Sequence, residues 1–217
     1  MGSDRSRPGR RPRAVPRERR RGDRAGQGRP GHRLSPAPPL VVTLLLDESA
    51  QQRFDRLRAA HFPARPLPGA RPERARGGEE GVFRLAAHVT LFHALPGAQL
   101  AEVRRELAAA ADRPAFPVTV SRVRLLGRGV AFDLESAELT GLWAGLADRF
   151  RPWLTRQGRQ PGRAHVTVQN KVDPALARAL HVELAAGFTP ETVAARGLGL
   201  WHYLEGPWGA EAEFLFR

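Results

Sequence analysis

The chain has 217 residues, of which 41% are hydrophobic and 26% charged, with a formal net charge of +13. This apolar content suffices for one compact domain or two small lobes. Cysteine is absent, which excludes disulfides, thiol nucleophiles and cysteine-ligated metal sites and indicates a reducing compartment. The first apolar run, at 40–46, comes too late for a secretory signal and falls far short of the ~20 residues that span a bilayer, so we expect a cytoplasmic protein with no membrane partner.

Much of the positive charge lies at the beginning of the chain. Residues 1–39 hold 12 arginines and three acidic residues, a net charge of +9, whereas residues 40–217 carry only +4. An Arg/Pro-rich segment with almost nothing to bury is expected to be a disordered tail. It could hold RNA or DNA electrostatically, but the spaced prolines favour a dispensable extension. We therefore place the folded domain at 40–217.

Within this domain, predicted strands and helices alternate. The continuous apolar run at 40–46 predicts a buried strand, and a helix is expected over about 49–60. Residues 63–81 are rich in proline and glycine and predict a long loop, either a substrate flap or an insertion. The later elements are strands at 87–93, 116–126, 130–134, 164–169, 193–204 and 212–216, and helices at 98–111, 136–157 and 174–186.

The predicted elements from residue 87 onward contain an internal repeat. The tetrapeptide Ala-His-Val-Thr occurs at 87–90 and again at 164–167, and in both copies a helix and a strand pair follow. This indicates two β-α-β-β units, at about 87–134 and 164–216. We predict an α+β fold, in which two lobes are related by a pseudo-two-fold axis around a central cleft. Its sheets are antiparallel or mixed, with helices packed outside.

The repeated motif carries reactive side chains. Alternation along a strand puts His88 and Thr90 on one face, and likewise His165 and Thr167. Two opposed imidazoles suit a reaction that needs a base and an acid, and the hydroxyls can donate to phosphoryl oxygens. Such a pair needs no metal, and a metal site would require a third ligand. The same alternation places His93 on the opposite face, where we interpret it as structural.

The doubled motif resembles that of the 2H phosphoesterase superfamily, in its 2′-5′ RNA ligase or RNA 2′,3′-cyclic phosphodiesterase branch. The similar segments are His88-Val-Thr-Leu91, His165-Val-Thr-Val168, 40–46, 61–63, 200–204 and 206–208, so the resemblance covers about 40–217. It implies a bilobal fold and hydrolysis of 2′,3′-cyclic phosphates to 2′-phosphates. It further implies that His165 activates water, that His88 protonates the leaving 3′ oxygen, and that Thr90 and Thr167 hold the phosphate.

We therefore expect a monomeric, metal-independent phosphodiesterase that uses no cofactor and acts on RNA or a nucleotide ending in a 2′,3′-cyclic phosphate, with 2′-5′ RNA ligation as the reverse activity. Two alternatives stay open: a catalytically weak module that binds RNA or phosphate, and the same chemistry on a small molecule such as ADP-ribose cyclic phosphate. Further candidates for stacking a base or binding phosphate are Trp201, His202, Tyr203, Arg128 and Arg163.

Overall fold

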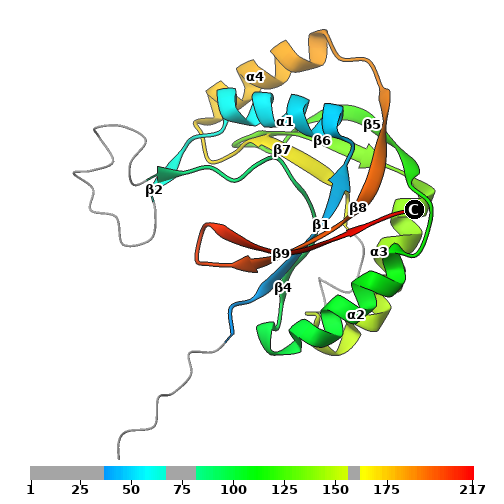
Figure 1. Ribbon diagram of the computed structural model, residues 1–217. Helices are drawn as coiled ribbons and strands as arrows, with labels where there is room; N and C mark the ends of the chain where they lie inside the picture. Colours follow the sequence, from blue (N-terminus) through cyan, green and yellow to red (C-terminus); the bar gives the residue numbers. More distant parts are fainter. Residues whose placement is uncertain (1–36, 67–81, 156–161) are drawn as a thin grey trace, which may run out of the picture. The chain divides into compact units, whose positions relative to one another are not determined.

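The computed structural model describes residues 37–66, 82–155 and 162–217 (Figure 1). The tail expected at 1–39 lies almost entirely outside the described residues, as does most of the loop expected at 63–81. The two ends of that loop form a small antiparallel ladder, β2 (Arg65–Pro66) with β3 (Val82–Phe83), which the sequence did not predict. None of the described helices is long and apolar enough to span a membrane.

Seven strands form the main sheet, and every pairing in it is antiparallel. Their order is β1 (Leu40–Leu46), β4 (Val89–Leu95), β7 (His165–Gln169), β6 (Val130–Glu135), β5 (Phe116–Leu125), β8 (Glu191–Tyr203) and β9 (Trp208–Leu215). A further pairing of β1 with β8 closes the order into a ring and leaves β9 at the edge. The long strand β8 makes this closure because its first residues pair with β5 and its later residues with β1 and β9.

The described part of the chain contains four α-helices, which cover the sheet in two groups. Helices α1 (Glu48–His61) and α4 (Pro174–Ala186) pack on β5, β6 and β7, whereas α2 (Leu100–Ala111) packs on β8, β9 and α3 (Ala137–Arg149). Three of the four helices begin at a side-chain cap, from Asp47, Ser136 and Asp173. Aromatic contacts join each group to the sheet, as Phe54 packs against Phe132 and Phe92 against Phe150.

The predicted α+β architecture and the internal repeat are confirmed. The first copy is β4-α2-β5-β6 and the second is β7-α4-β8-β9. Each motif strand lies near the strand pair of the other copy. Strand β7 of the second copy pairs with β6 of the first, and β4 of the first copy is separated from β8 of the second only by β1. This exchange brings the two His-x-Thr segments together where the halves meet.

Two element boundaries differ from the sequence prediction for physical reasons. Strand β4 begins at Val89 rather than at residue 87, because Ala87 hydrogen-bonds to side chains of α1 instead of to a neighbouring strand. The helix expected to reach residue 157 ends at Arg149 and is followed by a short 3₁₀ turn, Arg151–Trp153. Pro152 explains this end, because it has no N–H to donate and its ring clashes with the preceding turn.

Candidate active site

The two motif strands meet at a single residue pair. β4 and β7 run antiparallel, with Val89 opposite Val166. If this register is continued by one step in either direction, His88 corresponds to Thr167 and Thr90 to His165. Because both valines are buried, the histidines and threonines occupy the other face. His88 accordingly lines one cavity with Thr167, and His165 lines a neighbouring cavity with Thr90.

Helix α1 fixes the segment that leads into His88. The Asp55 carboxylate accepts from the Ala87 N–H at 2.6 Å, and the Gln51 amide donates to the Ala87 carbonyl at 2.9 Å. Arg58 donates from Nε to the Leu85 carbonyl at 2.8 Å and from Nη1 to the Thr167 carbonyl. Arg58, which is only 5% exposed, thus holds both motif segments in place from one guanidinium, and this group stacks on Phe62.

The two catalytic candidates have the same hydrogen-bonding geometry. Nδ1 of His88 lies 2.7 Å from the Ala86 carbonyl, and Nδ1 of His165 lies 2.8 Å from the Arg163 carbonyl. Since a carbonyl oxygen only accepts, both Nδ1 atoms carry a proton. In each ring the nitrogen left for a proton transfer is therefore Nε2, which accepts when the ring is neutral and donates when it is charged.

Electrostatics distinguishes the two rings. Burial, together with the charge of the nearby Arg58, lowers the pKa of His88 to about 4. The ring of Trp208, whose centroid is 4.6 Å away, covers part of His88. His88 is therefore neutral at neutral pH, with its Nε2 lone pair available.

A cavity of about 330 Å³ contains both histidines and Thr167. Arg58 and Asn170 add polar groups, and four aromatic side chains line it as well, namely Phe62, Phe83, Tyr203 and Trp208. Thr90 lies in a neighbouring cavity of about 500 Å³, which shares His165 and His93 with the first and is also lined by Trp143, Trp153 and Arg163. Both volumes are in the range of small-ligand sites.

His93 corrects one sequence interpretation. Strict alternation would turn it away from His88, but the structure places it in both cavities. Between Thr90 and Phe92 the register with β1 advances by two residues on β4 and by one on β1. This extra residue inverts the alternation, so Phe92 enters the core and His93 shares the face of Thr90. Burial and the charge of His165 lower the pKa of His93.

The structure separates the other candidates. Among the aromatic candidates Tyr203 lines the cavity, whereas Trp201 donates to the buried Thr43 hydroxyl and His202 lies 3.0 Å from Glu211. Arg128 donates to the carbonyl of Val172. Within the described part of the chain, no group of three metal-ligating side chains is placed to hold an ion.

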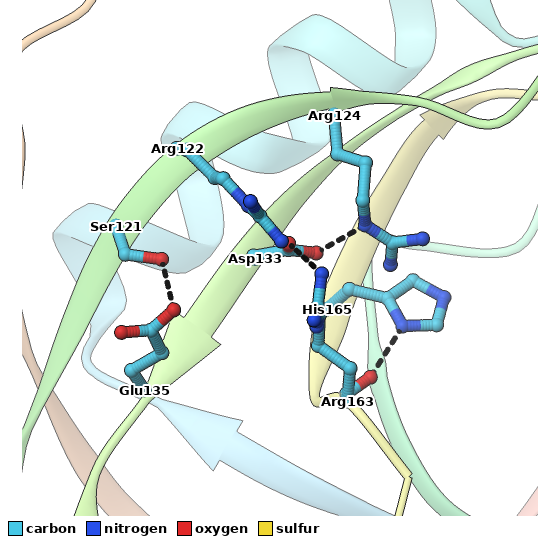
Figure 2. A network of polar contacts seen from close by, with 7 residues as sticks. All are labelled: Ser121, Arg122, Arg124, Asp133, Glu135, Arg163 and His165. Atoms are coloured by element: carbon cyan, nitrogen blue, oxygen red, sulfur yellow. Dashed lines mark hydrogen bonds and ion pairs between the residues drawn. The ribbon is translucent and has the colours of Figure 1, made fainter.

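Beside His165, one carboxylate gathers three arginines (Figure 2). Asp133, directly opposite His165 in the pairing of β6 with β7, is fully buried. It accepts from Nε of Arg122 at 2.8 Å and from Nε of Arg124 at 2.6 Å, and it lies 3.5 Å from Arg163. Burial works to raise the pKa of Asp133, but the hydrogen bonds from Arg122 and Arg124 outweigh it, so the pKa is lowered and the carboxylate stays ionised.

Sequence reasoning missed Arg58 and Asp133, although each left a signal. Ala50, Phe54 and Arg58 are spaced as one buried stripe of α1, and an arginine in such a stripe indicates a buried cation with backbone partners. Asp133 interrupts the apolar run of β6 while arginines alternate on the adjacent β5. A lone carboxylate in a buried strand requires a charged partner.

Comparison with known proteins gives a family and a fold. The sequence model of the 2′-5′ RNA ligase superfamily matches residues 46–207. No curated protein matches the chain.

Among solved structures, TT0787 of Thermus thermophilus is similar with a TM-score of 0.53 and 14% identity, covering 82% of this chain and 98% of that one. E. coli LigT in its apo form gives 0.51 and 16%, and a protein described as a phosphoesterase gives 0.50 and 18%; each match covers 84% of this chain and 99% of the other. These three likenesses concern the fold.

Proposed function

Because the chain belongs to the 2′-5′ RNA ligase superfamily, we propose that its cleft hydrolyses 2′,3′-cyclic phosphates, at RNA ends or on nucleotides, to 2′-phosphates. The observation that supports the proposal is the antiparallel Val89–Val166 pair, around which both histidines and both threonines line two neighbouring cavities. A phosphate bound over this face of the two strands would meet two imidazoles that can transfer protons and two hydroxyl donors.

The reaction needs two proton transfers. Water attacks phosphorus, a new P–O bond forms, and the bond from phosphorus to the 3′ oxygen breaks. One Nε2 takes a proton from the water, and the other gives a proton to the 3′ oxygen, so the atoms balance. Thr90 and Thr167 donate to the non-bridging oxygens, where negative charge builds up. A 5′-hydroxyl in place of water gives a 2′-5′ linkage through the same groups, which is the ligation activity.

The neutral state of His88 decides which catalytic role we assign to each ring. Its low pKa keeps it neutral, so we assign His88 as the base that activates water and His165 as the acid that protonates the 3′ oxygen. This reverses the roles implied by the family resemblance. The reason lies in the site itself: buried Arg58 lies in the cavity with His88 and disfavours a second positive charge there.

The aromatic wall of the smaller cavity favours a nucleoside over a small cyclic phosphate without a base. Phe83, Tyr203 and Trp208 offer ring faces on which a base can stack. A purely binding module would not need two imidazoles that both donate Nδ1–H to a carbonyl and whose Nε2 atoms accept from or donate to nothing among the described residues. We therefore favour an enzyme over a phosphate clamp.

The test is hydrolysis of a ribo-oligonucleotide with a 2′,3′-cyclic phosphate end, beside uridine 2′,3′-cyclic phosphate, in the presence of EDTA. The proposal predicts a 2′-phosphate product, identified by phosphorus NMR, and no loss of rate on chelation. His181→Ala, on the outer helix α4, is the matched control for the histidine variants. A 3′-phosphate product, or no turnover of any cyclic phosphate, contradicts the proposal.

A further inference from the structure

The face of β5, β6 and β7 that carries the motif residues has two cross-strand rows of side chains. In one row Arg122 is opposite Asp133, which is opposite His165; in the next, Arg124 is opposite Ala131, which is opposite Thr167. Adjacent strands are about 4.8 Å apart, so each arginine backbone lies roughly 10 Å from its motif residue. Arg122 and Arg124 therefore lie on the face of the sheet that also carries His165 and Thr167.

The arginines are anchored by one part of the guanidinium and leave the other part free. Arg122 and Arg124 each use Nε to reach Asp133. Among the residues that the structure describes, their Nη atoms donate to no acceptor, and none of those atoms is buried without a partner. The free edge of a guanidinium held in this way presents two N–H groups to a phosphate group. Figure 2 shows both side chains converging on Asp133 next to His165.

The cluster holds more positive charge than its buried acid requires. One arginine in bidentate contact would compensate Asp133, yet three guanidiniums surround it. The other carboxylate of this network, Glu135, accepts from Ser121 at 2.9 Å and contacts none of the three. The three arginines together with Asp133 therefore carry an excess of two positive charges beside His165.

The cluster also continues into the larger cavity. Arg163 lines that cavity together with Thr90 and His165, so a chain entering it passes from the motif residues to Arg163, which in turn contacts Asp133. The side chains of Arg122 and Arg163 are 51% and 55% exposed, which leaves them accessible to a polymer as well as to a small anion.

We propose that Arg122, Arg124 and Arg163 bind a phosphodiester of the RNA strand that carries the cyclic end, so that the preferred substrate is an oligoribonucleotide rather than a mononucleotide. This proposal rests on the proposed function, whose chemistry the arginines do not perform. Asp133 acts as a positioning residue, because it fixes the guanidiniums in one arrangement before the strand arrives.

Two measurements test the arginine cluster. The first is the ratio of kcat/KM for a cyclic-ended hexaribonucleotide to kcat/KM for uridine 2′,3′-cyclic phosphate. This ratio should exceed ten in the wild-type protein and fall at least tenfold in Arg122→Gln/Arg124→Gln. The second is binding of a fluorescein-labelled hexaribonucleotide with a 3′-phosphate end, followed by anisotropy across a salt series. Each lost phosphate contact should flatten the slope of log affinity against log salt by roughly 0.7.

Arg149→Gln is the matched control, since this arginine of α3 is similarly exposed and its ion pair with Glu106 is also lost. Arg163→Gln removes the longest contact with Asp133 and provides a variant that should keep its thermal midpoint if the double variant does not fold. An unchanged ratio and salt slope in a folded variant overturn the proposal. If no cyclic phosphate is hydrolysed, the proposed function fails, and the binding measurement alone decides whether the arginines hold RNA.

Discussion

The neutral state of His88 couples the stability of the fold to pH. The unfolded chain takes up a proton at the ordinary histidine pKa of 6.5, whereas the folded protein resists until the pKa of about 4. Between these two pH values only the unfolded state is stabilised by protonation of His88. The contribution of His88 to the free energy of unfolding is therefore fully present above pH 6.5 and is lost as the pH falls to 4. Each unit of difference between the two pKa values contributes about 1.36 kcal/mol, so the upper limit is about 3 kcal/mol. The ring is partly open to the cavity, which keeps the real contribution below this limit.

Urea unfolding of the wild type and of His88→Gln, at intervals from pH 7.5 to pH 4, measures this contribution. The free energy of unfolding of the wild type should fall by up to about 3 kcal/mol more than that of the variant over this range. His181→Gln is the control for loss of a histidine on an outer helix. If His88→Gln and the wild type lose stability in parallel, the folded His88 titrates normally and its assignment as the base has no electrostatic support.

Three further predictions concern the leaving group, the hydroxyls and the tail. His165→Ala should retain far more activity on a p-nitrophenyl phosphodiester than on a cyclic nucleotide, because p-nitrophenolate leaves without a proton. His88→Ala should lose activity on both substrates. The opposite pattern would restore the catalytic roles implied by the family resemblance. Thr90→Ala and Thr167→Ala should each lower kcat/KM by roughly tenfold, since one hydrogen bond to a charged oxygen is lost, and serine at either position should rescue it. Deletion of residues 1–36 should leave mononucleotide hydrolysis and the thermal midpoint unchanged, and a clear drop in either would show that the tail packs on the domain.

The doubled His-x-Thr segment was readable from the sequence because a duplication imposes the same local pattern twice. Strand alternation then sufficed to place each histidine with its threonine on one face, and the buried Val89 and Val166 agree with this. The repeat alone does not predict that the two segments meet. They meet because each motif strand lies near the strand pair of the other copy, and local sequence patterns do not specify such long-range pairing.

The remaining features depend on tertiary contacts. Arg58 matters because the carbonyls of Leu85 and Thr167, far from it in the sequence, come within reach of one guanidinium. His93 faces the cleft because β4 contains an extra residue relative to β1, and a one-residue shift inverts every following side chain. Neither the partner carbonyls nor the register of a neighbouring strand can be read from periodicity alone.

The most direct test of the account is the pH dependence of uridine 2′,3′-cyclic phosphate hydrolysis in EDTA by the wild type, His88→Ala and His165→Ala. Transfer of protons by both imidazoles predicts a bell-shaped kcat/KM profile for the wild type, reporting the coupled pair. Each variant should fall by roughly 10²–10⁴-fold and lose one limb of the profile. A variant of either histidine with a wild-type rate, or activity that disappears in EDTA and returns with zinc or manganese, would contradict the two-histidine mechanism.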